Sequence, residues 1–204
     1  MRRTTLDKIF SVGGLLLALL LIVLGLVLQN QANFANTYVS DQLSAQKITF
    51  TPADKLTEDE KKAPCLTTYA GQTLTTGEQA ECYANSYIGL HLTEVNDGKT
   101  YSQTSAESRA LTTKATEAIK ANPDDAAAKD LDKQAKALAG KVDTLFKGET
   151  LRGLLLTSYG FSVFGQRAAQ AALVCFLAGG VLLIASIAGF VHAMSKSSKA
   201  EIIE

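Results

Sequence analysis

The sequence has little of what enzymes and metalloproteins use to build their sites. Its 204 residues include only two histidines and three cysteines. It contains no HExxH, paired CxxC, CxxCH, GxSxG or GxxxxGK[ST] motif, the common signatures of zinc, haem, nucleophilic and phosphate-binding sites. Twenty basic and twenty acidic residues give a formal net charge of zero, with no dense basic patch. We therefore expect no catalytic, cofactor or metal site and no nucleic-acid partner.

One pair of residues could still suggest catalysis or metal binding. His91 and Glu94 are three residues apart, so they share one face if the segment is helical. A metal site would need further ligands from elsewhere in the chain, so we favour a surface or locally hydrogen-bonded histidine. His192 lies at the end of an apolar run, where the membrane interface or a helix C-terminus explains it.

Two apolar runs organise the chain. Residues 9–28 and 171–194 contain no Asp, Glu, Lys or Arg. A helix needs about 20 apolar residues to cross a hydrocarbon core of about 30 Å, and both runs are long enough. They predict two transmembrane helices. Because neither contains a charged residue, this chain alone lacks the charged relay that is typical of pumps and transporters.

A cleaved signal peptide is the alternative interpretation of the first run. The run exceeds the usual apolar length of about 7–15 residues for a signal peptide, and no small-x-small cleavage site follows it. Arg2, Arg3 and Lys8 precede the first run, and Lys196 and Lys199 follow the second. Since cytoplasmic flanks retain positive charge, we expect residues 1–8 and 195–204 to be cytoplasmic and the intervening loop to be extracytoplasmic, with the protein in the plasma membrane.

The cysteines agree with this topology. Cys65 and Cys82 are the only two in the loop, and an even pair outside the cytoplasm indicates a disulfide. Two separate buried thiols are the alternative. Cys175 lies within the second run and is expected to be a packing residue.

Residues 29–149 are predicted to form a mainly helical extracytoplasmic domain. The first span should continue as a helix over residues 30–47. Thr57 and Glu60 have capping-box spacing for a short helix, and a second helix should cover residues 77–95 behind a Thr cap.

The rest of the loop is rich in Ala, Lys, Asp, Glu and Thr. A capping box of Thr104 and Glu107 predicts a helix to Ala121. Asn122 and Pro123 predict the N-cap and first residue of an antiparallel partner helix. Disorder of residues 106–140 is the alternative, because few large apolar residues are available there.

The loop ends in an apolar segment with basic residues. We expect Gly148 to interrupt the preceding helix, and residues 150–170 to form an interfacial amphipathic helix that leads into the second span. A buried helix of the extracytoplasmic domain is the equal alternative.

Small residues recur in both predicted spans at intervals of about four, a spacing that allows close helix approach. The expected helix-packing residues are Gly14, Ala18, Cys175, Gly179, Ala185, Gly189 and Ala193.

Several segments carry a family resemblance: AQKITFTPA at 45–53, YAGQTLTTGEQA at 69–80, HLTEVNDGKTYS at 91–102 and LFKGETLRGLLLTSYGF at 145–161. With the two spans, they resemble a family of actinobacterial two-span membrane proteins that are often labelled aromatic ring-opening dioxygenases. An extradiol dioxygenase needs an iron site of two histidines and a carboxylate. The two histidines here are predicted on opposite sides of the membrane, so the sequence argues against that activity. The architecture is similar to that of accessory subunits around the cytochrome bcc–aa3 respiratory supercomplex.

The expected fold is therefore an all-α membrane protein: two transmembrane helices in a hairpin, a mainly helical extracytoplasmic domain and one disulfide. Two functions fit this fold. One is a non-catalytic accessory subunit whose partners are the bilayer and other membrane subunits, with cytochrome bcc and aa3 subunits as the specific candidates. The other is a free-standing envelope module that binds a lipid or a peptide between its helices.

Overall fold

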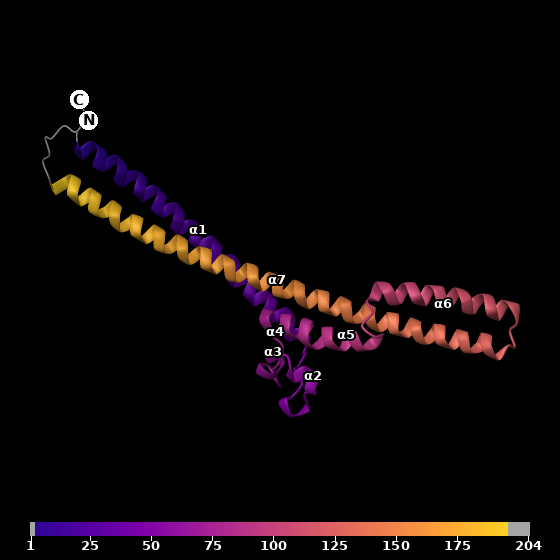
Figure 1. Cartoon of the computed structure of the whole chain (residues 1–204). Helices are drawn as coiled ribbons and strands as arrows, with labels where there is room; N and C mark the ends of the chain where they lie inside the picture. The colour runs from indigo at the N-terminus through magenta and orange to yellow at the C-terminus, as the bar shows by residue number, and fades with distance from the viewer. Residues whose placement is uncertain (1–2, 196–204) are drawn as a thin grey trace. The chain divides into compact units, whose positions relative to one another are not determined.

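The computed structural model describes residues 3–195, which are mainly helical, with no β-strand among them. The predicted tail, apart from Ser195, lies outside the described residues, as do Arg2, Lys196 and Lys199 of the basic flanks. The helices are α1 (Arg3–Ala45), η1 (Ala53–Lys55), α2 (Glu58–Lys61), α3 (Pro64–Thr68), α4 (Gly77–Cys82), η2 (Tyr83–Ile88), α5 (Gly89–Val95), α6 (Tyr101–Ala121) and α7 (Ala126–Ser195) (Figure 1). One isolated antiparallel bridge joins Thr49 to Thr73.

The chain divides into two compact units. The first contains residues up to Tyr38 and from Phe161 onward, and the second contains Val39–Gly160. The first unit holds the apolar parts of α1 and α7, and both helices are long and apolar enough to cross a membrane. As predicted, α1 continues as a helix beyond its apolar run, to Ala45.

The C-terminal helix differs from the prediction. Gly148 does not interrupt it: residues 150–170 are an internal part of the 70-residue helix α7, and not a separate interfacial helix. The physical reason is local. A single glycine costs only about 1 kcal/mol in a helix, and here the missing side chain makes room for Leu92 of α5.

Capping boxes begin three of the helices in the second unit. Thr57 with Glu60 caps α2 as predicted, and Thr76 with Gln79 caps α4. The prediction for α6 was wrong by one turn, because Thr100 and Gln103 form its box.

The two residues expected to cap α6 have other roles. Thr104 is fully buried, and its hydroxyl accepts a hydrogen bond from the Asn96 amide at 3.2 Å. Glu107 pairs with Lys99 at 2.8 Å, and this interaction raises the pKa of Lys99.

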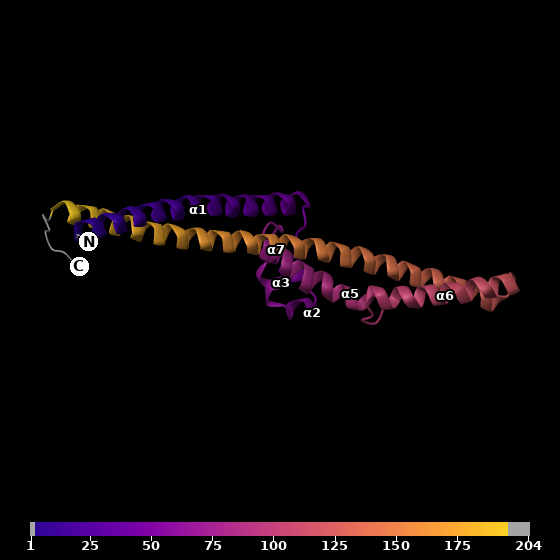
Figure 2. The ribbon, with the colours of Figure 1, turned by 90° about the horizontal axis from the view of Figure 1, so that it is seen from above.

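Asn122 is not the N-cap that the sequence predicts. It is the C-cap of α6, and its side chain accepts from the backbone of Asp124. Asp125 precedes α7, and its carboxylate accepts from the backbone N–H of Ala127, as an N-cap side chain does. Residues 106–140 are therefore helical around a short turn, and both views show α6 alongside the first part of α7 (Figures 1 and 2).

The core of the second unit lies under α2–α5. Its largest fully buried side chains are those of Phe50, Leu66, Leu74 and Leu145. The predicted helix over residues 77–95 is continuous but not uniform, because η2 in its middle is a π-helix. A π-helix widens the backbone spiral and is frequent at functional sites.

Candidate functional site

Small residues repeat every seven positions along both helices of the first unit. The series is Ser11, Ala18, Gly25 and Ala32 on α1, and Gly165, Ala172, Gly179, Ser186 and Ala193 on α7, and every member is buried. A strict seven-residue repeat keeps one stripe of a helix facing its neighbour. We call these nine residues the small-residue seam.

Contacts across the seam run in opposite directions along the two helices. A Cβ added to Gly14 would lie 2.5 Å from Ser186 Oγ, and one added to Gly25 would lie 2.7 Å from a ring carbon of Phe176. Residue numbers in the contacting pairs therefore rise along α1 as they fall along α7, so the two helices are antiparallel in the first unit.

At Gly179, α7 comes closest to the backbone of α1. A Cβ added there would lie 3.2 Å from the carbonyl oxygen of Ala18, which cannot rotate away as a side chain can. Close approach through small residues is typical of helices that pack in lipid.

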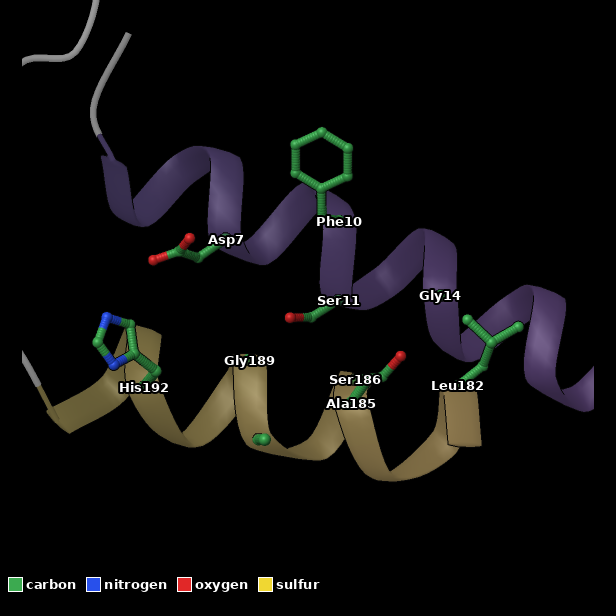
Figure 3. A pocket seen from close by; sticks show the side chains of 10 residues that line it. Asp7, Phe10, Ser11, Gly14, Leu182, Ala185, Ser186, Gly189 and His192 are labelled. Carbon is green, nitrogen blue, oxygen red and sulfur yellow. The ribbon is translucent and has the colours of Figure 1, made fainter. Parts of the chain in front are cut away.

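A hollow of about 520 Å³ opens between the helices at one end of the seam. In Figure 3 the side chains of Asp7 and His192 extend toward each other from the two helices, and Ser11 and Ser186 lie deeper. These four polar residues lie at the end of the helix pair where residues 9–28 begin and residues 171–194 end.

Most of the residues predicted to pack the helices lie at the seam or beside it. Ala18 is fully buried, Ala193 is nearly so, and Gly179 belongs to the same series. Gly14 faces Ser186, and Gly189 faces Ser11.

Two predicted packing residues neither belong to the seam nor face one of its residues. Ala185 is exposed, and Cys175 is only half-buried. The seam residues that sequence reasoning missed are Ser11, Gly25, Ala32, Gly165, Ala172 and Ser186. A search at intervals of seven, in place of four, would have found them.

The second unit holds the cysteine pair. Cys65 of α3 and Cys82 of α4 form the predicted disulfide, with an S–S distance of 2.10 Å and a Cα–Cα distance of 6.0 Å. It fixes α3 against α4, beside the buried side chain of Leu66.

A column of aromatic rings runs from this disulfide region along η2 and α5. The rings of Phe50 and Tyr83 are 5.3 Å apart, those of Tyr83 and Tyr87 are 4.7 Å apart, and those of Tyr87 and His91 are also 4.7 Å apart. Burial raises the pKa of Tyr83, so its phenol is neutral at physiological pH.

The column ends on a buried carboxylate. Glu60 accepts a hydrogen bond from the Thr57 backbone at 2.7 Å, and its other oxygen lies 3.1 Å from His91 Nε2. The Thr57 backbone bond, and then the His91 side chain, lower the pKa of Glu60 in spite of its burial. Glu94 lies 3.6 Å from His91 Nδ1. The arrangement holds α2 against α5.

His91 and Glu94 do share a helix face, as their spacing predicts. Within residues 3–195, however, no group of three or more His, Cys, Asp and Glu side chains stands close enough to hold a metal ion.

Sequence reasoning missed a second polar site in this unit. Arg152 of α7 donates to Asn85 Oδ1 of η2 at 3.2 Å and to Glu149 at 3.4 Å, while its buried Nε has no partner within the described part of the chain. It borders an open hollow of about 700 Å³, which we call the Arg152 hollow. The hollow is also lined by Asp59 and Lys62, which pair with each other at 2.6 Å. The Arg152 guanidinium could receive a carboxylate or a phosphate group there.

No protein-family model, curated protein or solved structure matches the chain.

Proposed function

We propose that this chain is a non-catalytic accessory subunit of a larger plasma-membrane complex, anchored by a hairpin of two transmembrane helices. The observation that carries the proposal is the small-residue seam between two long apolar helices. Helices in lipid gain little from hydrophobic burial, so they associate through close backbone packing, which such a seam provides.

The outward side chains of the helix pair support a lipid environment. Phe10, Leu20, Val174 and Val181 are between 63 and 75% exposed. Large apolar side chains on all sides of a helix pair would be poorly solvated in water, whereas a hydrocarbon core accommodates them.

The basic flanks and the disulfide support the proposed topology, with both termini cytoplasmic and the second unit outside. Disulfides persist in oxidising compartments, and positive flanks stay in the cytoplasm. Attachment of a membrane-impermeant maleimide to an Asp54→Cys variant in intact cells tests this topology. Labelling supports it, and labelling only after lysis contradicts it.

The partner proposal rests on the family resemblance and on the architecture. An anchored domain without cofactor motifs suits a subunit that packs against a catalytic complex, and the bcc–aa3 respiratory supercomplex is the specific candidate. Tagged protein purified from membranes in mild detergent tests it by mass spectrometry and a haem spectrum. Near-stoichiometric bcc and oxidase subunits would support the proposal. Migration as a lone 21.7 kDa chain or a dimer would contradict it.

The Arg152 hollow favours the second candidate function, a free-standing envelope module that binds a lipid or a peptide. An anionic headgroup or a peptide carboxylate would pair with Arg152, whose buried Nε has no partner within the described residues. Mass spectrometry of the purified protein should then detect a retained ligand that Arg152→Gln loses. The matched variant Arg109→Gln, on the exposed face of α6, should retain it.

A further inference from the structure

The hollow at one end of the small-residue seam has a polar lining that helix packing does not explain. Asp7 and Ser11 of α1 and Ser186 and His192 of α7 contribute its four polar side chains, and all four residues belong to the first unit (Figure 3). We call this space the seam hollow.

The Asp7 carboxylate has no partner in the protein that accounts for it. Asp7 is the only acidic residue of the first unit within residues 3–195, and it forms no ion pair with any of these residues. It also lies beyond the first turn of α1, where the helix dipole would favour a negative charge. The carboxylate is therefore available to a cationic group from outside the chain.

His192 faces Asp7 across the hollow. Figure 3 shows the two side chains extending toward each other from the two helices. No ion pair joins them in the described part of the chain. A molecule that offers a cation to the carboxylate and an acceptor to the imidazole N–H would bridge the two side chains.

Two hydroxyls lie deeper in the same hollow. Ser11 and Ser186 are each only 4% exposed, and neither hydroxyl forms a hydrogen bond within residues 3–195. Ser186 lies against Gly14 and Ser11 against Gly189, and a glycine Cα offers no conventional hydrogen bond. The other seven residues of the seam are Gly or Ala, so close packing does not require serine here. Since a buried hydroxyl without a partner is destabilising, a bound acceptor would stabilise this end of the helix pair.

Under the membrane placement proposed above, on which this inference rests, the seam hollow lies at the level of the lipid headgroups. The first apolar run begins at Ile9. At a rise of about 1.5 Å per residue, Asp7 lies about 3 Å outside the run and Ser11 about 3 Å inside it. The headgroup region extends about 5–7 Å beyond the hydrocarbon. The carboxylate is thus at headgroup height, and the Ser11 hydroxyl is near the ester groups that join headgroup and acyl chains.

The seam hollow also opens toward the surrounding lipid. Leu182 and Ala185 line it, and Ala185 is exposed. Farther along the seam, the close approach of Gly179 to the Ala18 carbonyl leaves no room between the helices. A phospholipid could therefore place its headgroup in the hollow and its acyl chains over the apolar side chains outside the pair.

We propose that the seam hollow binds the headgroup of phosphatidylethanolamine, a phospholipid with a primary ammonium. The ammonium donates to the Asp7 carboxylate, the phosphate accepts from the His192 ring N–H, and an ester oxygen accepts from the Ser11 hydroxyl. The volume of about 520 Å³ lies within the range of small-molecule sites.

This chemistry predicts selectivity among phospholipids. The quaternary ammonium of phosphatidylcholine has no N–H to donate, and phosphatidylglycerol has no cation for Asp7. The seam hollow should therefore prefer phosphatidylethanolamine to both.

Native mass spectrometry of the full chain tests the selectivity. The protein is purified in detergent and given equal amounts of the three lipids. The parent should retain phosphatidylethanolamine several-fold more than either of the others. Asp7→Asn should abolish this preference and Ser11→Ala should weaken it, whereas Ser195→Ala, which removes an exposed hydroxyl outside the hollow, should keep it. No preference in the parent, or an unchanged preference in Asp7→Asn, would overturn the proposal.

Free ethanolamine distinguishes a lipid site from a site for a soluble amine. In excess, it should displace little of the bound lipid, because it has neither the phosphate for His192 nor the ester oxygens for Ser11. Complete displacement would show that the hollow recognises the ammonium alone, and it would overturn the assignment to a lipid.

A fluorescence measurement separates failure of this proposal from failure of the membrane placement. The chain has no tryptophan, so Leu20→Trp provides a single reporter in vesicles with brominated acyl chains. Strong quenching is expected. Strong quenching without any lipid preference would overturn the headgroup site alone. An unquenched Leu20→Trp would contradict the membrane placement, and this proposal with it.

Discussion

The two units bury opposite kinds of side chain. In the first unit, the buried seam is made of Gly, Ala and Ser, and the large apolar side chains point outward. In the second, Phe50, Leu66 and Leu74 are buried around a disulfide, and charged residues cover the helices.

The contrast follows from the solvent proposed for each unit. In water, burying large apolar surface is the main source of stability, at about 25 cal/mol per Å². In lipid that term vanishes between helices, so close approach and shape decide the packing. Substitutions should therefore lower the free energy of unfolding for opposite reasons in the two units. In the seam the cause is added side-chain volume, and in the second unit it is the loss of a disulfide or of side-chain contacts.

The largest effect is expected at Gly179. The Gly179→Leu variant would force a side chain against the Ala18 carbonyl. The helix pair should therefore separate, or its free energy of unfolding should fall by about 3 kcal/mol or more. Thermal unfolding followed by circular dichroism measures the loss. Gly180→Leu is the matched control, because nothing lies within 4 Å of a Cβ added at Gly180. If both variants unfold at the same temperature, the seam does not hold the helices together.

The disulfide should give the next largest effect. Replacing Cys65 and Cys82 by serine opens a loop with a sequence separation of 17, which should cost about 3 kcal/mol. Denaturant unfolding with and without reductant measures it. Cys175→Ser should stay within 1 kcal/mol of the parent, because the free thiol is only half-buried. An equal loss from Cys175→Ser would show that the two units do not differ as described.

The smallest effect is expected at Glu60. Glu60→Ala removes the Glu60 half of the capping box of α2 and the His91 contact, and it should lower the free energy of unfolding by about 1–2 kcal/mol. Glu60→Gln keeps the box, as Gln79 and Gln103 do in α4 and α6, and should cost less than half as much.

Glu60 also predicts a pH dependence. Its pKa is lowered in the folded state, so its stabilisation is complete above the ordinary value of 4.5 and is lost as the pH falls through the lowered pKa. Unfolding between pH 3 and 6 should show this acid sensitivity in the parent and less of it in Glu60→Gln. An identical pH profile would contradict the assigned role.

Local chemistry made much of the domain predictable. Thr57 and Glu60 predict the start of α2 correctly, because a capping box needs only two residue types at a fixed spacing. The disulfide between Cys65 and Cys82 was equally predictable. Thr104 and Glu107 carry the same spacing, but Thr100 and Gln103 compete one turn earlier, and burial of Thr104 decides in their favour. Sequence spacing alone cannot rank two such boxes.

The candidate sites were less predictable because they depend on tertiary contacts. Gly148 reads as a helix breaker until its contact with Leu92 is known. The π-helix over Tyr83–Ile88 leaves no periodic signal in so short a segment. Arg152 lies in the segment that was predicted to be interfacial, and only the fold brings it to Asn85, 67 positions away.

Pairing of the two spans through the seam is tested most directly by an engineered disulfide. A Cβ added to Gly14 lies 3.8 Å from Ser186 Cβ, within the usual Cβ–Cβ range of about 3.5–4.5 Å for a disulfide. The double variant Gly14→Cys, Ser186→Cys is made in a Cys175→Ala background with a protease site after Gly98. After oxidation in carbonate-washed membranes and cleavage, its two fragments should stay joined until reductant is added. The control, Gly13→Cys with Ser186→Cys, should separate, because nothing lies within 4 Å of a Cβ at Gly13. Separation of the Gly14→Cys fragments, or equal joining in the control, would contradict the account.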